Sequence, residues 1–576
     1  MRNPLIKATA GGFAAAIVAA AVVIPPASAS SSAAVPFSQA NFSGYATGTE
    51  LHLGTTALNS LDQITGGNLS PITGLSINSL DQGFSAASTN TAGLTTPLTS
   101  ELQTVIQPAQ AATTKAFDEG AGLQLNLGGT TGATLNNLAN TVLAAAKQAI
   151  PAPAIALAPP NIPGVTNQSA LSLDPIANAS SLLGQAQANF PTASCPTSDI
   201  SYGLGNLTAA NILTGLPTLT SSGVNSAPLI STAGDGTSVF LSKSLTSLVP
   251  NGDGTYGIQT QASDIIAPIT FNLLGLATLE ISVQSAGGVN DPVTLTATTS
   301  GEPSVPATVK MSTDDILTVK LTAAGQSTPA IDEQVPLSSV ASNGKQIPLS
   351  ISGISALLSQ LTLPQLTTFL ENTLNSLPSG STLSSALNQV LGVLQPVVSP
   401  VESALNTVTP TLQQIISTLN GVINLNLGEI DIETVPHAIG GAFGSSPATT
   451  GGTAASGAFQ LLNIKLGLTN SSINIPQQVV NQVNIPLTSI QLPDIALANP
   501  AVGVLEANSN QQQPISCATV QAQNNPTLPT PTTVPPKLPF TGGPGGLWQP
   551  VVGVGTLGLG GFSLALVRRL RRRSAA

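Results

Sequence analysis

The alternation of apolar and polar side chains between Ala227 and Ala324 constrains the fold of this chain most. Segments 278–284, 293–298 and 316–322 read Thr-Leu-Glu-Ile-Ser-Val-Gln, Val-Thr-Leu-Thr-Ala-Thr and Ile-Leu-Thr-Val-Lys-Leu-Thr. A period of two places alternate side chains on opposite faces of a strand. Asn251-Gly-Asp-Gly254 adds a turn signal ahead of a further strand. Strands about 12 to 20 residues apart, separated by Gly and Pro, predict a mainly β fold with an antiparallel sandwich.

Helical insertions are expected within this β-rich chain. Apolar residues recur at helical spacing at about 98–117 and again over 351–419, where several prolines interrupt the pattern. Three alternating segments of similar sequence, 122–128, 422–428 and 461–467, predict related strands without a fixed repeat. Segments 160–195 and 436–456 are rich in Pro, Gly, Ser and Ala, which predicts long surface loops.

The last forty residues combine a short motif, an apolar segment and a basic end. The motif is Leu538, Pro539, Phe540, Thr541 and Gly542, and the basic residues of the tail 568–576 are Arg568, Arg569, Arg571, Arg572 and Arg573. Between them, 547–567 is predicted to be a transmembrane helix, because the 20 uncharged residues Trp548–Val567 span about 30 Å at ~1.5 Å each. Clustered arginines stay in the cytoplasm, so the preceding chain lies outside.

This order and spacing resembles the LPXTG cell-wall sorting signal of Gram-positive surface proteins. The resemblance implies that a sortase cleaves between Thr541 and Gly542 and transfers the Thr541 carbonyl to an amine of a peptidoglycan precursor. The membrane then holds the chain only before sorting. A plain single-pass anchor, in which the motif is a chance proline turn, is the alternative. The signal covers only the tail and implies nothing about activity.

The start of the chain predicts export. Arg2 and Lys7 precede an apolar run over 11–24, and small residues at 27–29 place the cleavage of a signal peptide, 1–29, between Ala29 and Ser30. The secreted ectodomain then covers 30–523. It is followed by a stalk, 524–537, whose five prolines favour an extended polyproline II spacer of about 40 Å.

A second resemblance lies at the start of this ectodomain. Phe42-Ser-Gly-Tyr-Ala-Thr-Gly48, followed by Leu51-His-Leu53, is similar to the mature N-terminus of actinobacterial surface proteins of the choice-of-anchor kind. In that group, similar ectodomains carry different C-terminal anchors. The likeness covers about a dozen residues and brings no catalytic residues with it.

Charge excludes one class of partner. Without Arg2, Lys7 and the five terminal arginines, the mature chain keeps 8 Lys and no Arg against 25 Asp and Glu, a net charge of −17. Such a chain repels phosphate backbones and lacks the guanidinium groups that read bases, so we expect no nucleic-acid binding. Only 7% of the residues are charged, and an uncharged polar surface is expected.

Two cysteines, Cys195 and Cys517, remain in an exported chain. Export favours oxidation, which predicts one disulfide between them. The alternatives are two free thiols or a nucleophilic cysteine with a histidine partner.

Metal and cofactor sites are not expected. The only histidines, His52 and His437, have no His or Cys neighbour, and no zinc, phosphate-loop or nucleophile-elbow motif is present. Asp253 with Asp235 or Asp291 could be imagined as a calcium site. Turn aspartates are the better interpretation, because no loop of calcium-ligand spacing is present.

Carboxylates are the only candidates for catalysis. The pairs Asp314-Asp315 and Asp332-Glu333, and the alternating Glu429, Asp431 and Glu433, could supply acid and base groups. A sugar hydrolase usually needs aromatic platforms, yet the single Trp lies in the anchor. We interpret the 429–433 carboxylates as the solvated face of an exposed edge strand.

The sequence therefore favours a wall-anchored surface protein of structural or adhesive type, with no catalysis of its own. Its expected partners are sortase, a peptidoglycan precursor, and a wall polymer or a neighbouring surface protein. The alternative is a wall-displayed, carboxylate-dependent hydrolase.

Overall fold

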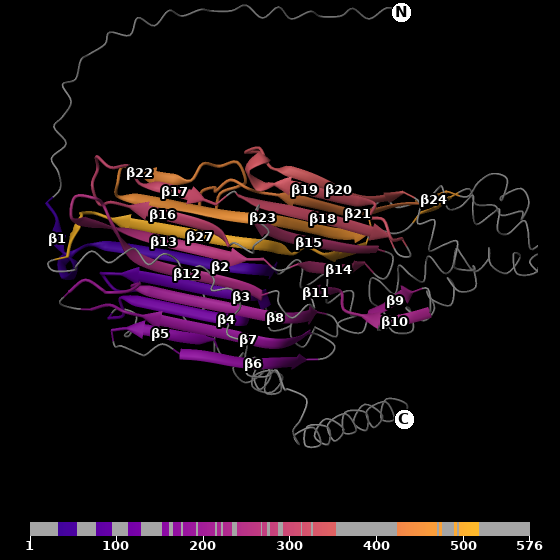
Figure 1. Cartoon of the computed structure of the whole chain (residues 1–576), viewed down its shortest axis with the longest axis horizontal. Coiled ribbons are helices and arrows are strands. Elements are labelled where there is room, and N and C mark those ends of the chain that lie inside the picture. The colour runs from indigo at the N-terminus through magenta and orange to yellow at the C-terminus, as the bar shows by residue number, and fades with distance from the viewer. Residues whose placement is uncertain are drawn as a thin grey trace, which may run out of the picture. The chain divides into compact units, whose positions relative to one another are not determined.

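β-Strands make up nearly all of the regular structure of this protein, a computed structural model of which is shown in Figure 1. The structure describes residues 33–54, 77–94, 113–127, 153–159, 165–173, 177–191, 194–212, 216–220, 223–232, 239–266, 268–273, 277–285, 292–312, 314–323, 326–352, 423–468, 472–474, 489–491 and 495–517. The predicted signal peptide, stalk, sorting motif, transmembrane segment and basic tail lie outside these residues. So do Asp235 and Asp291.

Among the described residues the larger sheet has fourteen strands, and its main path runs β1-β28-β13-β12-β8-β11-β14-β15-β18-β19. Its strands are β1 (Val35–Pro36), β6 (Val165–Leu173), β7 (Ala177–Ala188), β8 (Ser201–Ile212), β11 (Ile230–Thr232), β12 (Val239–Pro250), β13 (Thr255–Ile265), β14 (Ile269–Leu273), β15 (Ala277–Ser285), β16 (Val293–Thr299), β17 (Thr308–Met311), β18 (Asp315–Ala323), β19 (Ile331–Pro336) and β28 (Ile515–Ser516).

The second sheet has twelve described strands, with the main path β25-β24-β21-β23-β27-β2-β3-β4-β5. Its strands are β2 (Phe42–Gly54), β3 (Ile77–Asn90), β4 (Ala116–Leu127), β5 (Ala154–Ala158), β20 (Lys345–Ser352), β21 (Ile423–Ile432), β22 (Ala448–Thr450), β23 (Ala454–Leu468), β24 (Ser472–Asn474), β25 (Ser489–Gln491), β26 (Ile495–Ala498) and β27 (Ala501–Gln511). A separate hairpin joins β9 (Leu216–Thr220) to β10 (Gly223–Ala227).

The mainly β, antiparallel architecture expected from the sequence is confirmed. Every described pairing is antiparallel except that of β1 with β28. The alternating segments 278–284, 293–298 and 316–322 lie in β15, β16 and β18. The three similar segments fall largely within β4, β21 and β23.

The expected helices are wrong where the structure describes them. Ala116 and Phe117 begin β4, where Phe117 packs with Leu94 and Leu157. At the start of the second expected helix, 351–352 end β20. The only described helices are single 3-10 turns, η1 (Phe37–Gln39) and η2 (Leu337–Ser339). Within the described part of the chain, no helix is long and apolar enough to cross a membrane.

The loop expected at 160–195 is also wrong, because it contains β6 and β7. The loop expected at 436–456 holds only the short β22 and the start of β23. The small residues of β7 that resembled loop composition are those that allow it to pack closely against the other sheet.

The two sheets touch backbone to backbone over part of their contact. A Cβ atom built on Gly184 would overlap the carbonyl group of Gly120 in the opposite sheet. One built on Gly205 would overlap the carbonyl oxygens of Phe84 and Ala121. Stacked sheets usually lie about 10 Å apart because side chains separate them. Here glycine removes that separation, and we call this region the glycine seam.

Serine and threonine hydroxyls bond the sheets where the seam continues. Ser85 of β3 lies 2.8 Å from the hydroxyls of both Ser242 and Ser244 on β12. Thr299 of β16 and Ser509 of β27 are paired in the same way at 2.9 Å. Each of these five hydroxyls thus has a partner, which avoids the cost of burying it alone.

The inward face of β2 changes along its length. Gly44 and Gly48 face the opposite sheet, as the atoms around them show, whereas Leu51 and Leu53 belong to the main hydrophobic core. Regular alternation would keep even-numbered positions inward. Glu50 lies at the change, and the pairings of β2 with both neighbouring strands skip it.

Glycines with left-handed backbone stand on both sides of Glu50. We call Gly83, Glu50 and Gly503, which lie side by side on three neighbouring strands, the irregular row. Gly83 on β3 and Gly503 on β27 stand opposite Glu50 and have φ values of 60° and 65°. Glycine adopts such φ values at little cost. Because the row crosses three neighbouring strands, all three change at the same place which of their alternating side chains face the other sheet.

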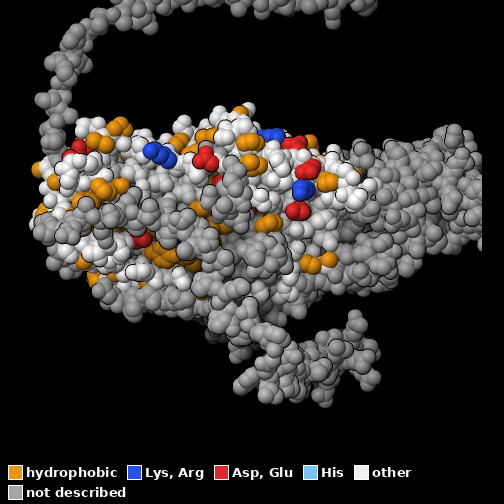
Figure 2. Space-filling model, in the orientation of Figure 1, with side chains coloured by type: hydrophobic (Ala, Val, Ile, Leu, Met, Phe, Trp, Pro, Cys, Tyr) orange, Lys and Arg blue, Asp and Glu red, His pale blue; other side chains and the backbone are white. Residues whose placement is uncertain are grey.

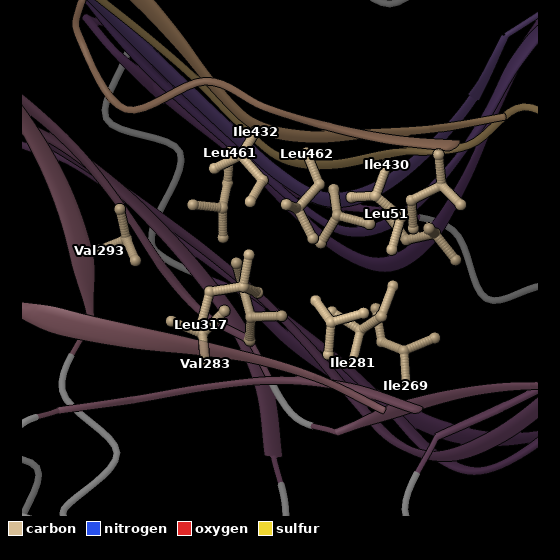
Figure 3. Close-up of a cluster of buried hydrophobic side chains, with 14 of the residues drawn as sticks. Leu51, Ile269, Ile281, Val283, Val293, Leu317, Ile430, Ile432, Leu461 and Leu462 are labelled. Atoms are coloured by element: carbon tan, nitrogen blue, oxygen red, sulfur yellow. The ribbon is translucent and has the colours of Figure 1, made fainter. Parts of the chain in front are cut away.

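Beyond the row, large aliphatic side chains fill the space between the sheets (Figure 3). Leu51, Ile430 and Leu462 from one sheet face Ile269 and Ile281 from the other. These side chains are fully buried, and burying each contributes about 1.5–3 kcal/mol. The body is therefore thin at the seam and thicker at this core.

The two ends of the described chain are joined. Val35 of β1 pairs with Ile515 of β28. Beside them Cys195 and Cys517 form the expected disulfide, with Cα atoms 5.6 Å apart and a sequence separation of 322. Phe37, Phe42 and Phe190 pack together in the same cluster. The first strand, the last strand and the disulfide thus close one end of the body.

We expect Gly205→Ala to lower the free energy of unfolding by at least about 3 kcal/mol, because backbone on the opposite sheet blocks the added methyl group. Denaturant unfolding measures the change. Gly54→Ala is the control, since its new Cβ would meet only the movable His52 ring, 3.3 Å away. Equal losses in the two variants would contradict the seam as described.

Candidate binding groove

A groove with a volume of about 520 Å³ lies over β20, β21 and β23 of the twelve-stranded sheet. Strand residues and the segments on either side of them line it: Asn343, Gly344, Lys345, Gln346, Asp431, Ile432, Glu433, Phe443, Gln460 and Asn463. Small-ligand sites usually measure about 300–1,000 Å³, so this groove is large enough to hold one.

β21 supplies the carboxylates of this region. Its Ile430 and Ile432 are buried between the sheets, and alternation turns Glu429, Asp431 and Glu433 to the outer face. These three acids do share one face. The expected edge strand is wrong, because β21 lies between β20 and β23. The acids therefore stand on the outer face of a paired strand.

Lys465 forms ion pairs with two of these carboxylates. Its Nζ lies 2.6 Å from Glu429 and 2.8 Å from Asp431. Hydrogen bonds to Asp431 and Glu429 raise the pKa of Lys465. Asp431 also accepts a hydrogen bond of 2.8 Å from the side chain of Gln346. Glu429 and Asp431 are thus occupied as ion-pair partners, a poor arrangement for proton transfer.

Glu433 is paired with a histidine that the sequence left without a role. His437 Nδ1 lies 2.9 Å from Glu433 Oε1, and both side chains are largely buried. Burial raises the pKa of nearby Glu506, and His437 lowers it in part. The other histidine, His52, lies 2.6 Å from Asp81. The structure does not bring the two histidines together.

An aromatic ring completes the groove. The Phe443 ring packs on the backbone at Gly344, where a Cβ would lie 3.1 Å from the Phe443 Cζ atom. Gly344 also has a φ of 82°. A side chain at this position would both strain the backbone and displace the ring.

The remaining candidate acids do not join the groove lining. Glu333 forms an ion pair of 2.9 Å with Lys345, while Asp332 is exposed on β19. Asp315 is buried at the start of β18, and Asp314 is exposed before it. In the described part of the chain, no cluster of three or more His, Cys, Asp or Glu could hold a metal ion.

Asp253 is a turn aspartate, as the sequence favoured. One of its oxygens accepts hydrogen bonds from the backbone N–H and the hydroxyl of Thr255, at 2.9 and 2.6 Å. These bonds, led by the hydroxyl, lower the pKa of Asp253.

Three acids inside the body were missed by sequence reasoning. Glu50, Asp118 and Asp264 are completely buried. Burial raises the pKa of Glu50, and the Asp264 carboxyl group raises it further. Burial likewise raises the pKa of Asp264 and of Asp118, which the hydroxyls of Ser242 and Ser201 lower in part. The sequence signal that could have identified them is an acid at a position where the alternation of a strand places side chains inside the body.

All three carboxyl groups are enclosed in the body, with no surface exposed to solvent. Neither oxygen of Glu50 has a hydrogen-bond partner within the described residues, and its carboxyl group lies against the backbone of Gly83. Charging such a group without a cation beside it costs several kcal/mol. We therefore expect Glu50 and Asp264 to keep protons well above the pH at which exposed acids lose them.

Comparison with known proteins identifies no relative, since no family model, curated protein or solved structure matches this chain.

The buried acids predict a stability that falls as pH rises. Because their pKa values are raised on folding, the folded state binds more protons than the unfolded state above about pH 4. The stabilisation is complete below the unfolded pKa and is lost as pH rises through the folded pKa. Each acid can contribute up to about 1.4 kcal/mol per pH unit in that window.

Denaturant unfolding at pH 5 and pH 7.5 measures this slope. Asp264→Asn should flatten it, because the amide does not titrate. Asp332→Asn, which changes an exposed acid on β19, is the matched control and should leave the slope unchanged. Greater stability of the unmodified chain at pH 7.5 than at pH 5 would contradict the prediction.

Proposed function

We propose that this chain is a cell-wall-anchored surface protein of structural or adhesive type, with no catalysis of its own. The signal peptide 1–29 directs export, and the stalk 524–537 connects the ectodomain 30–523 to the motif Leu538–Gly542. A sortase cleaves after Thr541 and joins the ectodomain to a peptidoglycan precursor. Until then, the helix 547–567 holds the chain in the membrane.

The closed end of the body is the observation that best supports this proposal. β1 and β28 lie side by side there, and the disulfide ties Cys517 to the body. The stalk follows Cys517 within seven residues, so tension on the anchor meets this covalent clamp first. A disulfide spanning 322 residues stabilises by at most roughly 5 kcal/mol in the chain-entropy model. Its position suits an anchored protein that must resist pulling.

The proposal extends to the fold and the partners. It includes an antiparallel sandwich built from the two sheets. Sortase and a peptidoglycan precursor act on the tail, and a wall polymer or a neighbouring surface protein contacts the body. The strongly acidic ectodomain takes no nucleic acid as a partner.

Deleting Leu538–Gly542 should move the protein from the muramidase-released wall fraction to the membrane or the medium. Without the motif, only the apolar segment 547–567 retains the chain. Deleting Thr527–Pro531 from the stalk is the matched control and should leave the protein in the wall. Complete extraction of the unmodified protein by detergent alone would overturn the anchoring proposal.

A hydrolase remains the second candidate, because Asp431 and Glu433 both line the groove. We expect no turnover of polysaccharide or ester substrates, since Asp431 is paired with Lys465 and Glu433 with His437. The measurement compares the unmodified chain with Glu433→Gln and with Glu429→Gln, which lies outside the groove lining. Turnover that Glu433→Gln abolishes and Glu429→Gln preserves would favour the hydrolase.

A further inference from the structure

We propose that the groove over β20, β21 and β23 binds an uncharged, hydroxyl-rich saccharide unit. The inference rests on the proposed adhesive function, for which it names the class of ligand. Three properties of the groove support it: its carboxamide groups, its paired charges and its aromatic ring.

Carboxamides are the most frequent polar groups in the lining. Four of them face the groove: Asn343, Gln346, Gln460 and Asn463. A carboxamide both donates and accepts hydrogen bonds, as a sugar hydroxyl does, so the two match in either direction. Within the described residues, the side chains of Asn343 and Asn463 have no hydrogen-bond partner of their own. Their donors and acceptors are available to a ligand.

Each charged side chain in the lining lies close to another titratable side chain. Lys345, the cation of the lining, pairs with Glu333 at 2.9 Å, and Asp431 pairs with Lys465. Glu433 lies 2.9 Å from His437, which is a cation only when it is protonated. On the face shown in Figure 2, charged side chains are few, and acidic and basic groups lie side by side where they gather. Among the described lining residues, the groove thus offers no unpaired cation to a phosphate or carboxylate polymer. An uncharged ligand fits it best.

Phe443 supplies an apolar surface, which the carboxamide groups of the lining do not. Its ring lines the groove and is held against the backbone of Gly344. Sugar rings carry apolar C–H faces as well as hydroxyls, and such faces pack against aromatic rings. The ring and the carboxamides together can therefore contact both kinds of sugar surface.

The test measures binding of neutral trisaccharides to the full chain by calorimetry. The probes are maltotriose, cellotriose, mannotriose and N,N′,N″-triacetylchitotriose, with polyglycerol phosphate as the anionic comparison. We expect at least one neutral probe to bind and polyglycerol phosphate not to bind. Phe443→Ala and Asn463→Ala should each weaken binding by about tenfold or more. Gln512→Ala, an exposed change at the other end of the body, should leave binding unchanged.

Unchanged thermal unfolding in all three variants establishes that the groove variants are folded. A parallel arm replaces the trisaccharides with wall polysaccharide isolated from the producing cell. This arm tests whether the ligand comes from the cell's own wall or from foreign glycans. Failure of all neutral probes and of the wall polysaccharide would overturn the inference, as would unchanged binding in the groove variants or preference for polyglycerol phosphate. Wall attachment is measured separately, so loss of saccharide binding with intact attachment overturns the ligand class alone.

Discussion

The backbone contact between the two sheets is the constraint on which the rest of this structure depends. At the glycine seam, Gly184 and Gly205 lie so close to the opposite strands that a single methyl group would overlap them. Sheets this close leave no room for apolar side chains, so hydroxyl pairs such as Ser85 with Ser242 join them instead. Stability in this half therefore comes from close contact and satisfied hydrogen bonds.

The seam also explains the position of the irregular row. The same strands continue from the seam into a thick aliphatic core. The seam needs small inward-facing side chains and the core needs large ones, so the inward-facing positions change between the two regions. Glu50 marks the change of set, and the left-handed Gly83 and Gly503 beside it make the change possible. Among the described residues, no cation is paired with the carboxyl group of Glu50 at this line. The carboxyl group is therefore buried in its neutral, protonated form, which couples the packing of the sheets to pH.

Sequence patterns predicted the thick half of the body better than the thin half. Segments that alternate Leu, Ile or Val with polar residues were recognised as strands because large apolar groups mark the buried face. β7 was mistaken for a loop, because Ala, Ser and Gly in 177–188 carry no such contrast. The disulfide was predictable since only two cysteines exist. The groove was not, because it joins Asn343, Phe443 and Asn463 from separate segments.

The filled interior of this body limits the places where it can bind a partner. The space between the sheets is filled by backbone contact, paired hydroxyls, buried acids and aliphatic side chains, so recognition must use outer faces. On β21, strand alternation that buries Ile430 and Ile432 presents Asp431 outward, where Lys465 and Gln346 hold it in place. The few charges on this acidic protein thus act on one another and fix the strand surface. Selectivity at the groove is left to amide groups and one aromatic ring, a combination that favours uncharged polar ligands over ions.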